Sequence, residues 1–150
     1  MPIKIYEHKT QYYETDQMGV IHHSNYIRWF EEARTDLMEQ IGIGYDVMES
    51  QGIMSPVLEV CSEYKSMTRY GETVCIYVKI QSYNGIRMHV AYEIKDKKTG
   101  EIRCTGESKH CFLSQDGKLI SVKQKKPEFH EIFTQYLLQQ ENKYGNGTNT

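Results

Sequence analysis

The stretch from Tyr12 to Gly42, YYETDQMGVIHHSNYIRWFEEARTDLMEQIG, decides the fold. Its second half carries apolar residues three and four positions apart, which places them on one face of a helix. Ser24 is suited to cap the start of this helix through its hydroxyl group, and Gly42 is suited to end it. The apolar positions are Tyr26, Phe30, Ala33, Leu37 and Ile41. A helix with so broad an apolar face needs a wide surface to lie on, and a β-sheet is the expected surface.

Most of the remaining chain alternates apolar and polar residues, which is the period of a strand with one buried face. Asn84-Gly85 predicts a tight hairpin turn, and Gly106 predicts a bulge or a close approach. The alternation predicts strands over residues 3–14, 57–66, 72–83, 86–96 and 101–114, with a short strand at 118–121. The predicted fold class is therefore α+β, an antiparallel β-sheet wrapped around one long α-helix.

Shorter segments complete the predicted domain. Residues 45–52 predict a short helix, and Pro127 is suited to start a final one. The basic run Lys123–Lys126 between them is interpreted as a solvated linker. Since 150 residues are typical of one domain, we expect a single domain over residues 1–144 and a disordered tail over 145–150.

Net charge and cysteine spacing exclude several classes of protein. The formal net charge of −2 gives no basic field that would attract nucleic acid or a membrane surface. The cysteines form no CxxC pair and lie in strand-like runs, so we expect buried free thiols in a reducing cytoplasm. They are Cys61, Cys75, Cys104 and Cys111. The chain shows no apolar segment of a signal peptide and no uncharged stretch long enough to span a bilayer.

Asp16 is the residue with the clearest chemical potential. Gly19 allows a tight turn after it, and the long helix starts a few residues later. A helix N-terminus presents free N–H groups and about half a positive charge, which can stabilise an oxyanion. A carboxylate beside such a site can attack a carbonyl carbon or activate water. The alternative is that Asp16 only caps the turn, as aspartate often does.

The same stretch resembles the 4-hydroxybenzoyl-CoA thioesterase family, including its Tol–Pal-associated acyl-CoA thioesterase branch. The shared pattern is Y-x-x-T-D-x-x-G-V-x-x-H-x-N-Y-x-x-x-x-E-x-A-R. It is carried by Tyr12, Thr15, Asp16, Gly19, Val20, His23, Asn25, Tyr26, Glu31, Ala33 and Arg34. The resemblance implies the hotdog fold and hydrolysis of an acyl-CoA thioester to a free acid and CoA, without a cofactor.

The resemblance also implies roles for individual residues. Asp16 corresponds to the catalytic carboxylate, acting as nucleophile or as general base, and the backbone N–H of His23 corresponds to the oxyanion donor. Tyr12 would line the site if a regular strand placed it on the same face as Asp16, with core packing as the alternative. Gly19 and Asn25 are expected at the substrate, although Asn25 is equally suited to bond the turn.

The CoA phosphates are expected to meet basic residues. In the family a basic cluster in the turn between the third and fourth strands contacts the nucleotide, whereas here that turn carries only Arg87. Arg69 and the Lys123–Lys126 run are further candidates on charge alone. Glu14 stands where the family usually has aspartate, an exchange expected to be tolerated. We expect a short or medium aliphatic acyl group.

Hotdog domains pair edge to edge, which removes exposed strand edges. The resemblance therefore predicts a homodimer through edge strands, with a dimer of dimers as the alternative, and a site at the interface. Adjacent His22 and His23 invite a metal interpretation. Neighbouring residues at a turn usually point apart, however, and no other residues have ligand spacing, so no metal site is predicted.

Two other functions stay open. A hotdog domain can bind acyl-CoA without catalysis, because a fold alone does not determine a function. A hotdog hydratase or dehydratase is the other alternative, but it uses a histidine and a carboxylate placed differently. Asp16 directly before the Gly19 turn favours a thioesterase over both.

Overall fold

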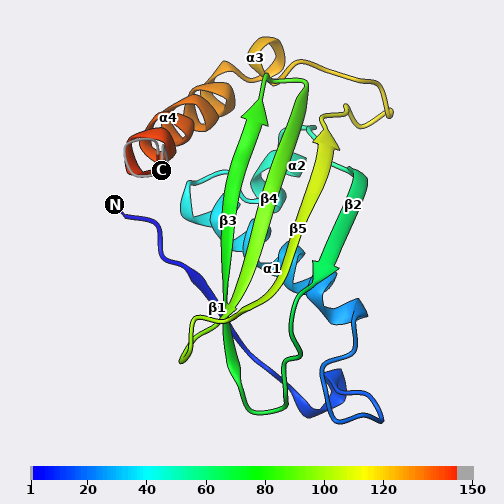
Figure 1. Ribbon diagram of the computed structural model, residues 1–150. Coiled ribbons are helices and arrows are strands. Elements are labelled where there is room, and N and C mark those ends of the chain that lie inside the picture. Colours follow the sequence, from blue (N-terminus) through cyan, green and yellow to red (C-terminus); the bar gives the residue numbers. More distant parts are fainter. Residues whose placement is uncertain (1, 145–150) are drawn as a thin grey trace.

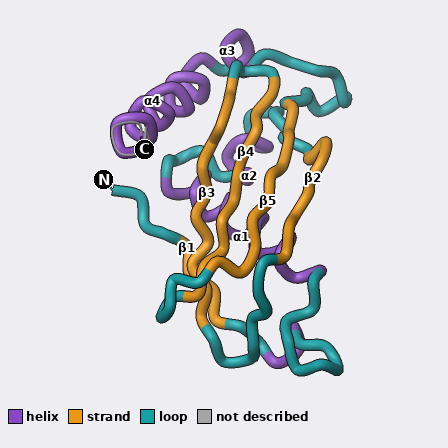
Figure 2. Tube along the Cα trace, viewed as in Figure 1, coloured by secondary structure: helices purple, strands orange, loops and turns teal. Residues whose placement is uncertain are grey.

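The computed structural model describes residues 2–144, and the predicted disordered tail at 145–150 lies outside them (Figure 1, Figure 2). The strands are β1 (Tyr6–Lys9), β2 (Val57–Tyr64), β3 (Thr73–Tyr83), β4 (Arg87–Asp96) and β5 (Ile102–Cys111). The helices are the 3-10 helix η1 (Tyr12–Glu14), α1 (Ser24–Gln40), α2 (Tyr45–Ser50), α3 (Val122–Lys125) and α4 (Pro127–Tyr144). The predicted short helix at 45–52 and the final helix from Pro127 are confirmed as α2 and α4.

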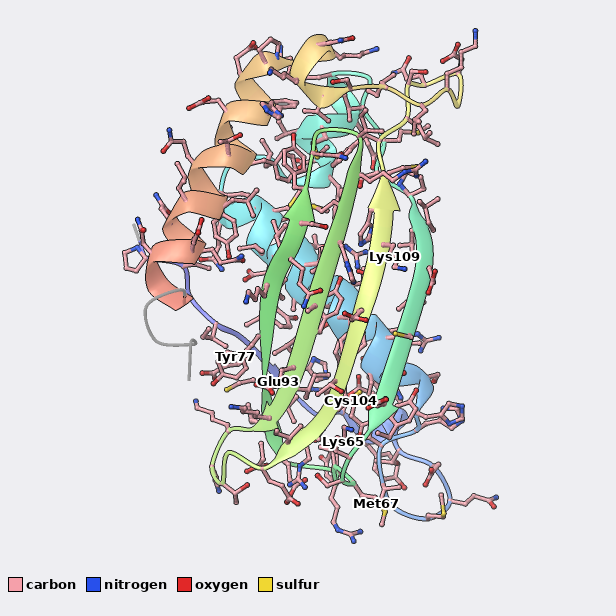
Figure 3. The ribbon with its side chains drawn as sticks, turned by 45° about the horizontal axis from the view of Figure 1, so that its top comes forward. Lys65, Met67, Tyr77, Glu93, Cys104 and Lys109 are labelled. Carbon is pink, nitrogen blue, oxygen red and sulfur yellow. The ribbon has the colours of Figure 1, made fainter. Side chains whose placement is uncertain are left out.

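Within the described range the strands form one antiparallel sheet in the order β1-β3-β4-β5-β2. α1 lies along one face of this sheet, and α4 crosses beside the outer edge of β3 (Figure 1). Figure 3 shows Tyr77, Glu93 and Lys109 on the sheet among the side chains of its other face. The predicted arrangement, an antiparallel sheet around one long helix, is confirmed.

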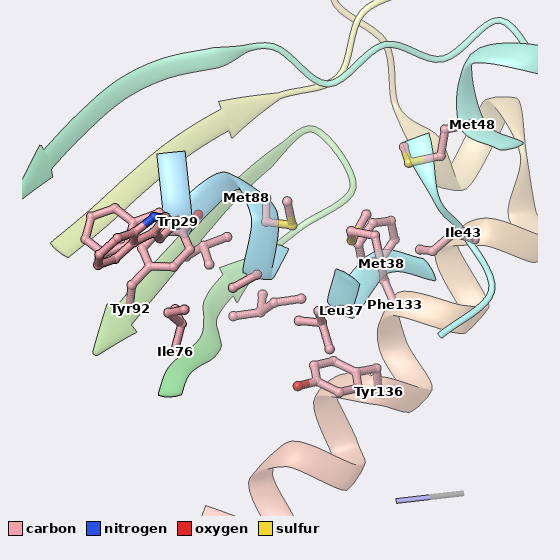
Figure 4. Packing of buried hydrophobic residues seen from close by; sticks show 14 of the residues in the cluster. Trp29, Leu37, Met38, Ile43, Met48, Ile76, Met88, Tyr92, Phe133 and Tyr136 are labelled. Carbon is pink, nitrogen blue, oxygen red and sulfur yellow. The ribbon is translucent and has the colours of Figure 1, made fainter. Parts of the chain in front are cut away.

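α1 and the inner face of the sheet bury a common apolar core (Figure 4). The predicted face of α1 is largely the buried one, since Tyr26, Phe30, Ala33 and Leu37 are all shielded from solvent. Strand β4 buries every second side chain, as its alternating sequence predicted. Those residues are Met88, Val90, Tyr92, Ile94 and Asp96. The apolar face of α1 and the apolar face of β4 therefore pack in one core.

Gly106 is the point where α1 comes nearest to the sheet. A Cβ atom there would stand 2.4 Å from Cε2 of Phe30 and 2.6 Å from the carbonyl oxygen of Cys61. The ring of Phe30 continues onto Tyr92, with ring centroids 4.5 Å apart in a stacked arrangement. Of the two roles predicted for Gly106, the close approach is confirmed, because only a residue without a side chain leaves room for this ring.

The first predicted strand, residues 3–14, is wrong over most of its length. Only Tyr6–Lys9 forms β1, and Tyr12–Glu14 turns into the 3-10 helix η1. The carboxylate of Glu14 accepts the backbone N–H of Gln11 at 2.7 Å, and the hydroxyl of Thr15 donates to the carbonyl of Tyr12 at 2.8 Å. Such local side-chain bonds compete with strand pairing and favour a turn.

The predicted cap of α1 is also wrong. Ser24 is the first residue of α1 and His23 takes the cap position without a side-chain bond. The Ser24 hydroxyl pairs instead with Nδ1 of His22 at 2.8 Å. At the other end, Gly42 has a φ of +92°, a left-handed conformation that suits glycine after a helix. Its predicted role is confirmed.

The segment after β5 differs from the prediction in two places. Residues 118–121 form no strand, only an isolated bridge between Leu119 and Leu113. The Lys123–Lys126 run is not an irregular linker, because Val122–Lys125 forms the short helix α3. The N–H of Val122 donates to the carbonyl of Gly85 at 2.8 Å, which ties α3 to the hairpin between β3 and β4. Val122 is buried there and holds the basic run in place.

The cysteines are all free, but only two of the four are buried as predicted. Cys104 and Cys111 lie in the core, Cys75 is half-buried, and Cys61 is exposed on β2. The difference has a simple cause. β2 is an edge strand with few atoms over it, so strand membership alone does not bury its side chains.

A row of buried polar groups crosses the core between α1 and β5. The guanidinium of Arg34 donates to the hydroxyl groups of Tyr45 at 2.8 Å and Tyr92 at 2.9 Å. Tyr92 shares a hydrogen bond of 2.6 Å with Ser108, whose hydroxyl lies 2.7 Å from Nε2 of His110. Burial, reinforced by the charge of Arg34, lowers the pKa of His110 to about 4. The imidazole is therefore neutral at pH 7.

This histidine predicts a pH-dependent stability. Between its folded pKa of about 4 and an unfolded pKa near 6.5, the unfolded chain binds a proton that the folded chain does not. Stability therefore rises with pH across this window and falls on acidification. We expect wild type to lose about 2 kcal/mol more than His110→Asn between pH 7 and about pH 4.5, measured by urea unfolding. Parallel pH profiles for the two proteins would contradict the assignment.

Candidate active site

The loop between η1 and α1 is closed by its own backbone. The N–H of Asp16 donates to the carbonyl of Val20 at 2.8 Å, and the N–H of Gly19 returns to the carbonyl of Asp16 at 3.0 Å. Gly19 has a φ of +79°, a conformation that side chains disfavour. Thr15 and Ile21 form an isolated bridge outside this turn. The predicted tight turn at Gly19 is present.

The Asp16 carboxylate is half-buried and has one free oxygen. Its Oδ1 atom accepts the backbone N–H of Met18 at 2.8 Å, a bond that aspartate makes at turns. Within residues 2–144 no group bonds Oδ2. The side chain thus caps its turn, as the structural alternative held, and still presents an oxygen to the surroundings. The two roles are compatible.

Asp16 opens into a hollow of about 440 Å³ beside the end of β2. Figure 3 marks this end of the sheet by Lys65 and Met67. The hollow brings together the loop, the start of α1 and the segment after β2. Its lining residues are Asp16, Met18, Val20, Ile21, His23, Tyr26, Tyr64, Lys65, Ser66 and Met67. Both residues predicted to be catalytic, Asp16 and His23, therefore face one space.

The peptide N–H of His23, just before α1, has no acceptor among the described residues. The N–H of His22 donates to the carbonyl of Glu14, that of Ser24 to Nδ1 of His22, and that of Asn25 to the carbonyl of His22. Among the described residues, nothing accepts the N–H of His23. The peptide N–H predicted as oxyanion donor is thus unpaired within residues 2–144.

Aromatic contacts fix the position of His23. Its ring stacks on that of His22 with centroids 4.2 Å apart, and Tyr64 meets it edge-on at 6.2 Å. The hydroxyl of Tyr64 donates to the backbone carbonyl of His23 at 3.1 Å. Tyr64 also lies against Tyr26, with ring centroids 5.4 Å apart. Tyr64, the last residue of β2, contacts the helix start and is therefore part of the same site.

Glu14 holds this loop from beneath through its side chain. It is 4% exposed, and its carboxylate accepts Nε2 of His8 at 2.9 Å, Nε1 of Trp29 at 2.8 Å and the N–H of Gln11 at 2.7 Å. Burial alone would raise the pKa of Glu14, but the hydrogen bonds from His8, Gln11 and Trp29 outweigh it and lower the pKa. Glu14 is therefore ionised in the interior.

The backbone of Glu14 holds the other end of the loop. Its carbonyl accepts the N–H of His22 at 2.8 Å and Nδ2 of Asn25 at 2.9 Å. Both the residue before Asp16 and the start of α1 are thereby tied to one residue. Sequence reasoning treated Glu14 only as a tolerated exchange. The overlooked signal was that the same motif contains an acidic residue, Glu14, and an indole N–H donor, Trp29, which can pair in the interior.

Asn25 and Tyr12 lie away from the hollow. Asn25 is buried and bonds the carbonyl of Glu14, which is the turn-bonding role weighed against substrate binding. Tyr12 is 78% exposed in η1 and meets Tyr70 edge-on at 5.7 Å. Tyr12 lies in η1, so no strand places it beside Asp16. Its exposure also shows that it does not pack in the core of the single chain.

The two predicted arginines lie at different ends of the sheet. Arg69 is exposed and pairs through its backbone with Val20, next to the Asp16 loop. Arg87 begins β4, at the hairpin on the far end of the sheet from that loop (Figure 1). A single chain therefore brings Arg69 near Asp16 and keeps Arg87 away.

Residues 2–144 contain neither a cluster of metal-binding side chains nor a membrane-spanning helix. No group of three or more histidine, cysteine, aspartate or glutamate side chains there has an arrangement that could hold a metal ion. The stacked rings of His22 and His23 lack further ligands in that range. Nor does any helix in the same range combine the length and apolar character needed to cross a bilayer.

Comparison with known proteins identifies the class. A family model described as the thioesterase-like superfamily matches residues 10–137, so the chain belongs to this superfamily. The match includes the Asp16 loop, α1 and the whole of β2 to β5. The predictions of a hotdog fold and of a thioesterase are confirmed at the level of this family. Assignment to the 4-hydroxybenzoyl-CoA or Tol–Pal branch stays a prediction.

Particular relatives carry more specific names. The chain is 35% identical over 128 residues to the Bacillus subtilis protein named "Putative acyl-CoA thioesterase YneP", covering 85% of this chain and 92% of that one. The crystal structure of DHNA-CoA thioesterase from Staphylococcus aureus has a TM-score of 0.85 and 37% identity, covering 94% of this chain and 93% of that one. A hypothetical protein from Aquifex aeolicus follows with a TM-score of 0.78 and 28% identity, covering 87% and 98%.

The Glu14 network predicts a large effect of a small substitution. In Glu14→Gln one carboxylate oxygen becomes an NH₂ group, which cannot accept a hydrogen bond. Depending on the orientation of the amide, either Trp29 or the pair His8 and Gln11 loses its acceptor. We expect the free energy of unfolding to fall by about 2 kcal/mol in urea titrations, because a buried donor loses its acceptor. Glu49→Gln is the matched control at an exposed position and should stay within about 0.5 kcal/mol. Equal stability of both variants would refute the role assigned to Glu14.

Proposed function

We propose that this protein hydrolyses an acyl-CoA thioester to a free acid and CoA in the hollow beside Asp16. The observation that carries the proposal is that Asp16 and His23 line one hollow and that no described group accepts the N–H of His23. A carboxylate and a preorganised N–H donor are the two groups that thioester hydrolysis requires. The family and the name of the 35% identical relative support the reaction.

Two routes lead to the same products. As nucleophile, Oδ2 of Asp16 attacks the thioester carbonyl, the C–S bond breaks, CoA leaves as thiolate, and water then hydrolyses the mixed anhydride. As general base, Asp16 takes a proton from water, whose oxygen attacks the same carbon; the C–S bond then breaks and the proton passes from Asp16 to the departing CoA sulfur. In both routes the carbonyl oxygen becomes an oxyanion, which the N–H of His23 stabilises. Tyr64 contributes by holding the peptide of His23 through its carbonyl.

The walls of the hollow favour an aromatic acyl group. His23, Tyr26 and Tyr64 present rings, and flat aromatic groups pack well edge-on or offset against such rings. The 37% identical relative is named for an aromatic CoA thioester. We therefore place an aryl-CoA ahead of the short or medium aliphatic acyl-CoA that we expected at the outset. Met18 and Met67 on the rim adapt to either shape.

We further propose that the working unit is a homodimer joined along β2. Strand β2 is an edge strand, yet it exposes large apolar side chains in the single chain. The exposed fractions are 45% for Val57, 54% for Leu58, 39% for Val60 and 48% for Tyr64. An open edge carrying apolar side chains is a pairing surface. Pairing with a second copy would satisfy the backbone groups of this edge and cover those side chains.

Such a dimer also explains Arg87. In an antiparallel pair of β2 strands, the hairpin end of one copy lies beside the Asp16 end of the other. Arg87 of the second copy would then approach the hollow together with Lys123 and Lys125, which α3 holds against the hairpin through the bond from Val122 to Gly85. These cations are suited to the phosphates of CoA. Arg69 of the same chain would contribute from the loop side.

Thiol release across a panel of aryl and aliphatic acyl-CoA substrates tests the reaction. Asp16→Asn keeps the shape and the turn bond, and should lower the rate at least about a hundredfold, a scale typical of a positioned nucleophile or base. Asp46→Asn, exposed on α2, is the control and should keep wild-type activity. Equal activity of wild type and Asp16→Asn would make Asp16 purely structural. Binding without turnover would support the acyl-CoA-binding module, and loss of enoyl absorbance without thiol release would support a hydratase.

The dimer proposal predicts a linked loss of assembly and activity. Replacing Leu58 and Val60 together by lysine places like charges on the edge of β2, which should prevent pairing while leaving Asp16 and His23 in place. We expect a dimer for wild type and a monomer for the variant by sedimentation equilibrium, with thiol release reduced at least about tenfold. A monomeric variant with full activity would show that the site needs only one chain.

A further inference from the structure

The outer edge of β3 is covered in two separate pieces. β1 pairs with it from Lys9 opposite Thr73 to Tyr6 opposite Ile76. Two residues beyond Val78, Gln140 of α4 replaces a strand. Its Oε1 accepts the N–H of Ile80 at 2.9 Å, and its Nε2 donates to the carbonyl of Ile80 at 2.8 Å. Because every second residue of a strand points its backbone groups to the same side, those of Val78 face the gap between the two pieces.

The N-terminal segment does not close this gap. Continued in register, Lys4 would stand opposite Val78. Gln40 of α1 binds both backbone groups of Lys4 instead, accepting its N–H at 2.9 Å and donating to its carbonyl at 3.0 Å. Asp36 holds the same amide through a bond of 2.7 Å from Nε2 to Oδ2. Gln40 thus binds the N-terminal segment to α1, and Gln140 binds α4 to β3. No described strand pairs with Val78 on this side.

A cavity of about 240 Å³ occupies this gap. Figure 4 shows Leu37, Ile76 and Tyr136 approaching it from α1, β3 and α4. Its apolar lining is formed by Ile3, Ala33, Leu37, Ile76, Val78 and Tyr136. Protein interiors seldom leave spaces larger than a water molecule, and an apolar cavity of about 150 Å³ is enough to bind benzene. By this comparison the cavity holds a molecule of about ten non-hydrogen atoms.

We propose that this cavity binds a small apolar molecule that carries one secondary amide. The amide N–H would donate to the carbonyl of Val78 and the amide oxygen would accept its N–H, as a neighbouring strand does. The alkyl part would lie against Leu37 and Tyr136. The cavity lining carries one acidic residue, Asp36, and one basic residue, Lys4, so the charges of the lining balance and a neutral ligand is favoured. The cavity shares no lining residue with the hollow at Asp16.

The test uses N-hexylacetamide and hexyl acetate, which have the same shape and differ by the amide N–H. ¹H–¹⁵N and methyl NMR titrations of the full chain follow Val78 and Leu37. We expect saturable shifts at both residues, with affinity about fivefold higher for the amide, the size of one net hydrogen bond. Absence of saturable shifts at Val78 would overturn the site. Equal affinities of amide and ester would overturn the proposed class of ligand.

A pair of neighbouring substitutions separates the cavity from the outer face of the sheet. Val78→Phe fills the cavity from its wall and should weaken N-hexylacetamide binding at least about tenfold. Lys79→Phe adds the same side chain to the exposed face one residue later and should leave the affinity unchanged. Thiol release should be the same in both variants, because neither contacts Asp16. Should Val78→Phe fail to fold, the wild-type shift map alone still decides the location, and equal weakening by both variants would contradict it.

Discussion

The buried carboxylate of Glu14 is the constraint on which the geometry of the site depends. A charge in the interior is tolerated only where donors surround it, and here they come from three separate segments. His8 belongs to β1, Gln11 precedes η1, and Trp29 lies one turn into α1. Satisfying Glu14 therefore brings the N-terminal strand, the turn and the long helix together. Its backbone carbonyl then accepts the N–H of His22 and the amide of Asn25, so one residue ties the segment before Asp16 to the start of α1.

The sequence is sufficient for the elements whose signals are local. The period of α1 and the alternation in β3, β4 and β5 are properties of neighbouring residues, and the structure bears them out. The N-terminal segment failed because its conformation is decided by distant partners. Nothing in the alternation of residues 3–14 shows that Glu14 will bond Trp29, and that bond draws the chain out of the sheet into η1. Likewise the basic run became α3 because Val122 has a core to enter.

In the candidate site too, local features could be predicted from the sequence and contacts from distant segments could not. Asp16 and His23 lie within one turn and one helix start, so their proximity follows from the local sequence, whereas the role expected of His23 came from the family resemblance. Tyr64 and Met67 arrive from a strand that is distant in sequence, and no spacing rule could bring them to the hollow. Arg87 was predicted beside the substrate and lies at the other end of the same chain. Only a relation between two copies, which one sequence does not specify, could reconcile that position with a role at Asp16.

The two edges of the sheet differ in how well a single chain covers them. On the β3 side, β1 and the amide of Gln140 cover the edge in turn, so the chain supplies substitutes for a missing strand. On the β2 side, no element of the described chain covers the edge, although that strand carries apolar side chains and ends at the hollow. Two separate elements therefore satisfy backbone groups along the β3 edge. The other edge of the sheet is left open next to the Asp16 hollow, which is where a second copy would both close the sheet and complete the wall of the proposed site.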